Sequence, residues 1–316
     1  MKFLPIFSIV AGLLLSLIPG AHAHWGDQVY PIIELTDSDL ARIDLQDGDI
    51  GDWEEIIGAP TLTALDFDLI RGQYDPSSFN SRLWLGWHDA SNRLYVAMEQ
   101  VDDFYVNEYD RNGFADATFI TTLHDGSIRL SVDGDHSGGT YTYASSDFDT
   151  DEEWAFSTDQ EAQGYAVIGE VFDSGTHIGT TATEILSQNG LEAVFEDWFV
   201  QPPYAAGGGG SQGEQPSVAV TEFYVTPFDR LIWNSLEESV ISDLFPGKTI
   251  GLSIRFADMD EPLIMESIYS LPGSGSRSAF TANGFADFVL VGTDGSIPQD
   301  TAVESGTWAR IKASFR

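Results

Sequence analysis

A short alternating stretch near the middle of the chain constrains the fold most. In residues 127–133 apolar side chains occupy every second position, and Asp133 and Asp135 carry the alternation into a glycine-containing turn. A period of two is typical of a β-strand with one face on an apolar core. The stretch therefore predicts a β-protein in which a strand leads directly into a group of oxygen-bearing side chains.

Similar strand patterns recur along the chain. Residues 93–101 and 249–256 alternate apolar and polar side chains, and residues 82–88 precede the first of them across an Asp-Ala-Ser-Asn turn. Many short strands separated by Gly, Asp, Asn and Ser turns are typical of antiparallel sandwiches. We therefore predict an all-β fold, a single antiparallel β-sandwich of the jelly-roll or immunoglobulin-like type.

Two segments depart from the strand pattern. Ser235 and Glu238 form a capping box before an apolar-sided segment that Pro246 ends, which predicts one short helix crossing between two strands. Residues 205–216 have the composition of a linker because they contain four consecutive glycines. They could separate two domains, but few strands follow them, so we prefer a flexible glycine-rich loop within one domain.

The first 23 residues have the form of a secretory signal peptide. Lys2 precedes an apolar stretch, and Ala21-His22-Ala23 has the small residues of a cleavage site. The apolar stretch is too short to favour a membrane anchor, and no later one approaches about 18 residues. We predict a secreted or periplasmic protein with an N-terminal extension at residues 24–42 and a sandwich domain at 43–316. The chain has no cysteine, so its core must be stable without disulfides.

The chain is strongly acidic. It has 50 acidic and 14 basic residues, a formal net charge of −36, and the acidic residues are scattered through the turns. A negative field of this size repels phosphate backbones and anionic lipid, so the charge argues against nucleic-acid partners and membrane insertion. We expect a monomer whose acidity serves solubility or, alternatively, cation binding.

The turn after residues 127–133 has the side chains of a calcium loop. Asp133, Asp135 and Ser137 carry oxygen at alternate positions, and Gly138 allows the sharp turn. The twelfth position is Ala144 rather than glutamate, which excludes an EF-hand. A calcium ion here would need further ligands, for which the candidates are Asp125, Asp147 and Asp149. The alternative is an acidic turn with solvated carboxylates.

Several motifs, taken in order, resemble the family 9-type carbohydrate-binding modules and the wider DOMON-like group of β-sandwiches. The motifs are Asp47-Gly-Asp-Ile-Gly-Asp-Trp53, Leu83-Trp-Leu-Gly-Trp87, Arg93-Leu-Tyr-Val-Ala97, Ser127-Ile-Arg-Leu-Ser-Val-Asp-Gly-Asp135, residues 223–229 and residues 246–260, which end in Asp258-Met-Asp260. The resemblance covers roughly residues 43–315. It implies a sandwich fold, sugar binding between aromatic rings, and bound calcium.

Aromatic side chains near predicted loops are the candidates for sugar contact, because flat rings pack against the C–H faces of sugars. These candidates are Trp154, Trp198, Tyr141 and Tyr143. For each of them, packing within the protein is the alternative. Trp53, Trp84 and Trp87 lie within strand or opening motifs, so we assign them to the core.

The sequence favours a binding protein over an enzyme. It has no Gly-x-Ser-x-Gly elbow and no phosphate-binding glycine loop, and its histidines are too dispersed for a zinc site. We therefore expect a non-catalytic carbohydrate- or polysaccharide-binding protein stabilised by calcium. One alternative is a structural or cell-surface module without a small ligand. Another is a component of a polysaccharide-processing enzyme, which would show two opposed carboxylates with perturbed pKa values.

Overall fold

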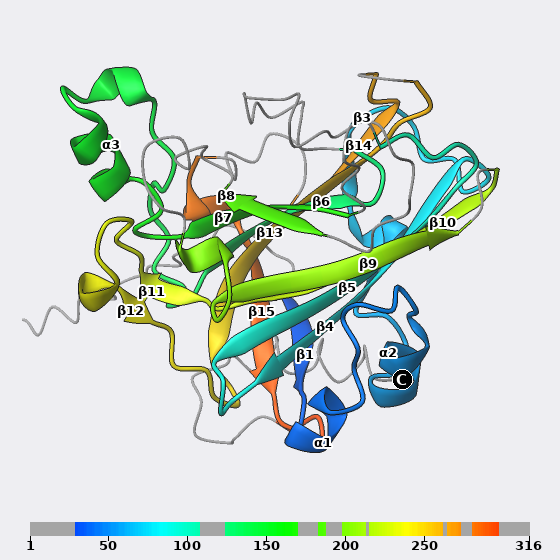
Figure 1. Cartoon of the computed structure of the whole chain (residues 1–316), viewed down its shortest axis with the longest axis horizontal. Coiled ribbons are helices and arrows are strands. Elements are labelled where there is room, and N and C mark those ends of the chain that lie inside the picture. The colour runs from blue at the N-terminus through cyan, green and yellow to red at the C-terminus, as the bar shows by residue number, and fades with distance from the viewer. Residues whose placement is uncertain are drawn as a thin grey trace, which may run out of the picture.

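The structure is a computed structural model, and β-strands make up most of what it describes (Figure 1). The described residues are 29–107, 124–169, 183–187, 198–212, 215–261, 264–272 and 280–296. The all-β prediction is therefore confirmed for this part of the chain. The predicted signal peptide at residues 1–23 lies outside the described residues.

One sheet of thirteen strands forms the body of the protein. Its strands are β1 (Val29–Glu34), β2 (Leu62–Thr63), β3 (Asp68–Arg71), β4 (Phe79–His88), β5 (Arg93–Asp102), β6 (Ser127–Asp133), β7 (Gln163–Ile168), β8 (Glu184–Ser187), β9 (Ala205–Gln212), β10 (Ser217–Val225), β13 (Thr249–Asp258), β14 (Ser267–Leu271) and β15 (Ala286–Val291). A two-stranded sheet contains β11 (Phe228–Arg230) and β12 (Val240–Ile241). The α-helices of the described part are α1 (Asp37–Leu40), α2 (Gly51–Ile56) and α3 (Asp151–Ser157).

The main sheet is mixed rather than antiparallel throughout. Its principal path runs β8-β7-β6-β13-β15-β1-β4-β5-β10-β9, and β1 pairs in parallel with both β15 and β4. The prediction of a purely antiparallel sandwich did not include this strand, because β1 lies in the segment assigned to an N-terminal extension. The long hairpin of β4 and β5 and the pairing of β5 with β10 are antiparallel, as the alternating sequence indicated.

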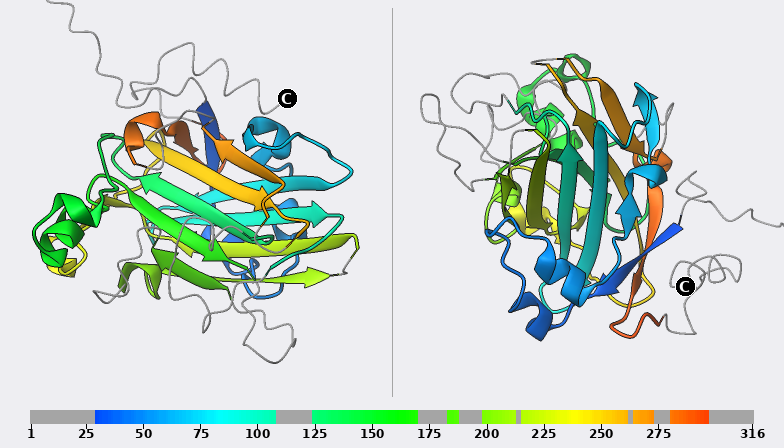
Figure 2. Two further views of the ribbon diagram at one scale, coloured as in Figure 1. Left: turned by 90° about the horizontal axis from the view of Figure 1, so that it is seen from above. Right: turned by 90° about the vertical axis from the view of Figure 1, so that its right-hand side faces the viewer.

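The sheet curves around one large apolar core (Figure 2). Val96 and Phe223, from β5 and β10, belong to the same buried cluster as Leu130 and Ile254, from β6 and β13. The apolar faces of distant strands in the path therefore pack against each other. A second cluster, which contains Trp53, lies between the helical N-terminal segment and the opposite face of β4 and β5.

The three tryptophans assigned to the core are fully buried, as predicted. The indole N–H of Trp84 donates to the carbonyl of Gly58 at 3.0 Å, and that of Trp87 donates to the carbonyl of Val291 at 2.9 Å. Trp53 donates to the Glu222 carboxyl group at 2.7 Å. Each ring is thus buried with its polar atom satisfied, which is the usual condition for burying tryptophan.

The four-glycine run is a strand, not a flexible loop. Residues 207–210 belong to β9, which pairs with β10 along its whole length at the end of the strand path. The N-terminal loop covers this strand: the Gln46 side-chain amide donates to the Gly207 carbonyl at 2.8 Å, and a side chain at Gly208 would overlap the Leu45 carbonyl oxygen. The glycines permit this close backbone approach, which a side-chain pattern cannot reveal.

The predicted crossing helix is reduced to a single 3₁₀ turn. Ser235 caps it by accepting from the Glu238 amide at 3.3 Å, but the turn spans only Leu236–Glu238. Ser239 then adopts extended backbone, and the chain continues into β12, where Val240 and Ile241 are exposed rather than buried on a helix face. The capping signal was correct, but the segment pairs with β11 instead of continuing as a helix.

Candidate metal centre and binding cleft

Three buried aspartates lie close together where three strands of the main sheet begin or end. Strand β5 ends at Asp102, β13 ends at Asp258, and Asp125 lies just before β6. Because β6 runs antiparallel to β13, the start of β6 lies beside the end of β13, and the Met259 amide donates to Asp125 Oδ1 at 3.1 Å. One carboxylate oxygen from each aspartate lies within 4.8 Å of those of the other two. We call these residues the inner triad.

The inner triad is buried but only partly hydrogen-bonded. Asp102, Asp125 and Asp258 are at most 3% exposed. Asp125 accepts from the amides of Val106 and Met259, Asp102 Oδ1 accepts from the Phe104 amide, and Asp258 Oδ2 accepts from Ser267. Asp102 Oδ2 and Asp258 Oδ1 have no donor among the described residues. Leaving such oxygens buried and unsatisfied is unfavourable, and a cation bound between them would relieve this cost.

Burial, and after it the charge of neighbouring carboxylates, raises the pKa values of the inner triad. Burial, with repulsion from Asp258 and Asp260 after it, raises the pKa of Asp102 to about 7. Burial likewise raises the pKa of Asp258 to about 6 and that of Asp125 well above its ordinary value. The charges that raise these values are those of other carboxylates. A bound cation would reverse this repulsion and hold the triad ionised.

The donor set fits a hard divalent cation. The triad supplies only oxygen atoms, which calcium and magnesium prefer over nitrogen or sulfur. The described residues contain no histidine or cysteine within these acidic groups, so zinc coordination is not favoured. A calcium ion bound to Asp102, Asp125 and Asp258 would satisfy the two orphaned oxygens directly.

The predicted calcium loop, residues 133–138, is not part of the inner triad. Its aspartate carboxylates accept hydrogen bonds from backbone amides of the same loop. Asp133 is fully buried, and its carboxylate accepts from the amides of Ser137 at 3.2 Å and Gly138 at 2.7 Å. Asp135 also accepts from the Ser137 amide, at 3.0 Å. Asp133, Asp135 and Ser137 thus shape a turn, and within the described ranges the groups of converging acidic side chains do not include them.

Part of the inner triad was visible in the sequence. Asp125 was a candidate additional ligand, and Asp258 belongs to an acidic pair that ends a recognised motif. Asp102, at the end of the strand in residues 93–101, was missed. One signal in the sequence is that an aspartate lies at the end of β5, at the end of β13 and just before β6. That the three side chains meet depends on the register of β6 against β13.

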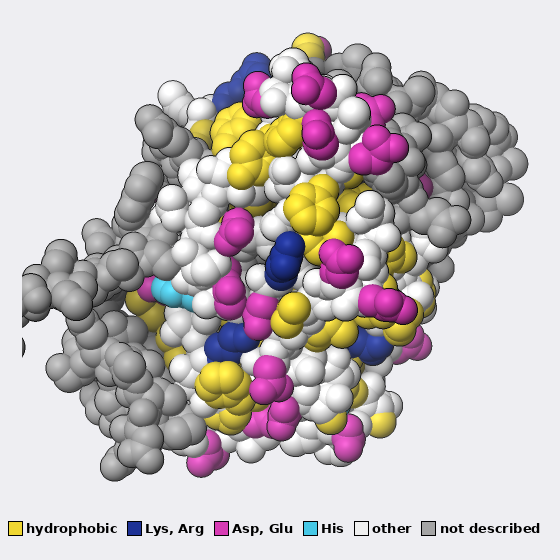
Figure 3. Space-filling view, turned by 90° about the vertical axis from the view of Figure 1, so that its left-hand side faces the viewer, with side chains coloured by type: hydrophobic (Ala, Val, Ile, Leu, Met, Phe, Trp, Pro, Cys, Tyr) yellow, Lys and Arg dark blue, Asp and Glu magenta, His cyan; other side chains and the backbone are white. Residues whose placement is uncertain are grey.

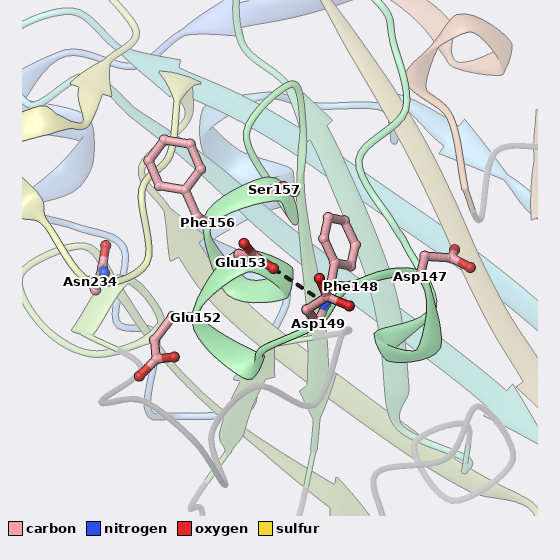
Figure 4. A pocket seen from close by; sticks show the side chains of 8 residues that line it. All are labelled: Asp147, Phe148, Asp149, Glu152, Glu153, Phe156, Ser157 and Asn234. Atoms are coloured by element: carbon pink, nitrogen blue, oxygen red, sulfur yellow. Dashed lines mark hydrogen bonds between the residues drawn. The ribbon is translucent and has the colours of Figure 1, made fainter.

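An open cleft of about 620 Å³ lies beside helix α3, and none of its lining residues belongs to the inner triad (Figure 4). Eight residues line it: Asp147, Phe148, Asp149, Glu152, Glu153, Phe156, Ser157 and Asn234. The Thr150 side chain caps α3 by accepting from the Glu153 amide at 3.2 Å, and the Glu153 carboxylate accepts from the Asp149 amide at 3.3 Å. These bonds fix the acidic loop against the first turn of the helix.

The cleft combines aromatic and hydrogen-bonding groups. Phe156 is 41% exposed, Phe148 is half-buried, and both rings are drawn with the lining carboxylates and the Asn234 amide in Figure 4. In the wider face that carries α3 and β12, acidic and apolar side chains are interspersed and basic ones are few (Figure 3). Such a cleft can bind a ligand with apolar faces and several hydroxyl or cationic groups.

Two of the predicted sugar-contact aromatics, Trp154 and Tyr143, contact each other and, through Tyr143, one of the rings that line this cleft. Trp154 lies on α3, is half-buried against the core, and donates its indole N–H to the Tyr143 carbonyl at 2.9 Å. Tyr143 packs edge-on against Phe148, with ring centroids 5.7 Å apart. The structure thus brings Trp154 and Tyr143 together next to the cleft, although neither lines it. Phe148 and Phe156, which do line it, were not candidates.

The other two candidates lie apart from the cleft. Tyr141 is fully buried and its hydroxyl donates to Ser131 at 3.1 Å, so the prediction that it lies in an exposed loop is wrong. The chain folds back at Tyr141 to pack its ring edge-on against Phe285. Trp198 is half-buried in an aromatic cluster with Tyr204 and Phe228, and its indole N–H donates to the Trp233 carbonyl at 2.8 Å.

Comparisons with known proteins give structural neighbours only. No protein-family model matches the chain, and no curated protein matches it. Among the helices that the structure describes, none has the length and apolar character to span a membrane.

The structural neighbours include two complexes of a family 9 carbohydrate-binding module and one further protein. A family 9 module from Caldicellulosiruptor kristjanssonii, solved in complex with cellotriose, is 12% identical and matches 88% of this chain and 98% of its own, with a TM-score of 0.48. The corresponding complex with glucose matches 88% and 100% at 12% identity, with a TM-score of 0.47. A candidate carbohydrate-binding protein from Bacteroides uniformis is 9% identical over 83% and 99%, with a TM-score of 0.36.

Proposed function

We propose that the chain is an exported, non-catalytic carbohydrate-binding protein that calcium stabilises. The observation that carries the proposal is the cleft beside α3, where two phenylalanine rings stand among carboxylates and an amide. Aromatic rings contact the apolar faces of a sugar ring, and carboxylates and amides accept or donate hydrogen bonds to its hydroxyls. The ordered sequence motifs described above favour the same function independently.

The calcium part of the proposal rests on the inner triad. Two buried oxygens, Asp102 Oδ2 and Asp258 Oδ1, have no donor in the part of the chain that the structure describes. The triad joins the ends of β5 and β13 to the start of β6. A calcium ion there would neutralise the repulsion between the carboxylates and tie three strands together. The proposed ligands are Asp102, Asp125 and Asp258, in place of the predicted Asp133, Asp135 and Ser137.

The proposal assigns no catalytic role to the carboxylates with raised pKa values. Perturbed acids in a cleft are candidates for general acid or base catalysis. Asp102, Asp125 and Asp258 are at most 3% exposed, however, and a carboxylate that is enclosed by the protein cannot contact a glycosidic bond. Their raised pKa values follow from burial and mutual repulsion, and both are expected of a cation site.

Calorimetric titration tests the sugar-binding proposal. Mature protein beginning at residue 24 is titrated with neutral gluco-, xylo- and manno-oligosaccharides, and then with acidic and amino-sugar oligosaccharides, with calcium present. We expect binding that Phe156→Ala weakens at least tenfold, because that substitution removes an exposed ring of the cleft. Phe245→Ala is the matched control, since Phe245 is similarly exposed, at 48%, but does not line the cleft. Absence of binding by every glycan class, acidic and amino sugars included, would refute the function.

A further inference from the structure

Four of the eight residues that line the cleft beside α3 are acidic, and none of the eight is basic. The acidic residues are Asp147, Asp149, Glu152 and Glu153, and we call them the cleft carboxylates (Figure 4). All four are exposed, and none forms an ion pair with a described residue. Within the described part of the chain, their negative charge is therefore available to a cationic ligand.

The cleft carboxylates are not arranged as a metal site. Among the described residues, three groups of acidic side chains bring their oxygens within 4.8 Å of one another, and none of these groups contains a cleft carboxylate. A calcium or magnesium ion needs several oxygen atoms in one coordination shell. The cleft carboxylates are instead distributed along an open cleft of about 620 Å³. This distribution suits a ligand that carries positive charge on several separate groups.

Two phenylalanine rings lie among the cleft carboxylates. Phe148 stands between Asp147 and Asp149 in the sequence. Phe156 follows Glu152 by four residues on α3, a spacing that places both side chains on the same side of the helix. Phe156 is 41% exposed and Phe148 is half-buried, so both rings offer apolar surface beside charged groups. The cleft therefore favours a ligand that combines apolar faces with cationic groups.

We propose that the cleft beside α3 binds an amino-sugar oligosaccharide, such as an oligomer of glucosamine, whose ammonium groups bind the cleft carboxylates. This inference rests on the proposed carbohydrate-binding function and names the class of sugar. The C–H faces of an amino sugar can pack on Phe148 and Phe156 as those of a neutral sugar do. Its ammonium groups also donate charge-assisted hydrogen bonds to carboxylates, and the opposite charges attract each other.

The charge of the cleft ranks the classes of sugar. An acidic sugar would be repelled by the cleft carboxylates and by the rest of the chain, whose net charge is −36. A neutral sugar can contact the rings and hydrogen-bond to the carboxylates and the Asn234 amide, but it carries no charge of its own. An amino sugar makes the same contacts and adds ion pairs. We therefore expect amino-sugar oligomers to bind most tightly, neutral oligomers less tightly and acidic oligomers least.

Calorimetric titration with a matched series of sugars tests the proposal. Mature protein, with calcium present, is titrated with glucosamine, N-acetylglucosamine and glucose oligomers of equal length at about 0.15 M ionic strength, which screens distant charges. N-acetylation removes the positive charge and keeps the sugar ring. We expect the glucosamine oligomer to bind at least tenfold more tightly than either neutral oligomer. Equal or weaker binding of the glucosamine oligomer overturns the inference but leaves the proposed function intact, whereas absence of binding by every glycan class refutes the function itself.

Variants of the cleft distinguish local recognition from general attraction to an acidic protein. In Asp149→Asn/Glu152→Gln each side chain keeps an acceptor oxygen but loses its charge, so the preference for glucosamine over glucose oligomers should fall at least fivefold. The matched control, Asp89→Asn/Glu237→Gln, removes two exposed charges outside the cleft and should keep the preference. Phe156→Ala should weaken the binding of both oligomers. An unchanged preference in the cleft variant, or an equal fall in the control, would overturn the proposal.

Discussion

Asp102 and Asp258 end two strands that are separated by about 150 residues in the sequence, and each carries one buried oxygen that has no donor among the described residues. Strand β10 pairs with β5, and β6 and β15 pair with β13, so the two aspartates are positioned by different parts of the sheet. Their carboxylates repel each other across the gap. Two ionised carboxylates at this site are therefore unfavourable unless a cation or a proton lies between them.

Asp258→Asn should have opposite effects with and without calcium. In EGTA at pH 7 the variant should be more stable than the wild type by about 1 to 3 kcal/mol, because the substitution removes a carboxylate whose pKa is raised to about 6. With calcium at a hundredfold excess over its dissociation constant, the wild type should gain roughly 2.7 kcal/mol per site and the variant much less. Thermal melts in EGTA and in calcium measure whether the order of stability of the variant and the wild type reverses. Asp89→Asn, an exposed control, should shift neither value, and parallel behaviour of Asp258→Asn and wild type would contradict the account.

Glu222 should make the protein less stable as the pH rises. Burial raises the pKa of Glu222 to about 8, against the opposing hydrogen bond from Trp53, and the nearby Asp52 and Asp47 add to the rise. The folded state thus binds a proton that the unfolded chain releases near pH 4.5, so the free energy of unfolding should fall between about pH 4.5 and 8. Glu222→Gln keeps an acceptor for Trp53 and should stabilise the protein by about 3 kcal/mol at pH 7 while leaving stability at pH 4 unchanged. Urea unfolding at several pH values measures this, and an identical pH profile in the variant would show that Glu222 is not its source.

Gly208 and Gly210, two of the four glycines of β9, should differ sharply in how well they tolerate alanine. Gly208→Ala should destabilise the protein by about 1 to 3 kcal/mol, because the added methyl group would overlap the Leu45 carbonyl oxygen. At Gly210 the added carbon would meet only the Gly48 Cα, at 3.7 Å, which is an ordinary contact. Gly210→Ala should therefore be neutral or slightly stabilising, since it also restricts the unfolded chain. Chemical denaturation compares the two, and equal effects would mean that the N-terminal loop does not cover β9 in solution.

Strands could be predicted from the sequence where apolar and polar side chains alternate. They could not be predicted where the close approach of two backbone segments determines the structure. Residues 93–101 and 249–256 lie within β5 and β13, because a strand with one face on the core must alternate. The glycines of β9 carry no such pattern, so their composition indicated a linker. The parallel pairing of β1 with β4 and β15 depends on partners about 50 and 260 residues away, which local sequence does not specify.

The candidate sites also depend on contacts that the local sequence does not specify. Acidic residues at a strand end were predicted as cation ligands, but the carboxylate of the predicted Asp133 accepts hydrogen bonds from backbone amides of its own turn. The unsatisfied aspartates could be identified only from strand register. Trp154 and Tyr143, two of the predicted sugar-contact residues, lie next to the cleft, but the rings that line it are Phe148 and Phe156. Choosing between neighbouring aromatics requires knowing which face of α3 packs on the core.

A crystal structure of the mature protein grown with calcium, with anomalous difference density measured at a long wavelength, tests the central claim most directly. The account predicts an anomalous peak that both Asp102 Oδ2 and Asp258 Oδ1 coordinate, with Asp125 as the third carboxylate ligand. Absence of a peak, with those two oxygens instead bound to a lysine, an arginine or ordered water, would contradict the claim that the inner triad is a calcium site.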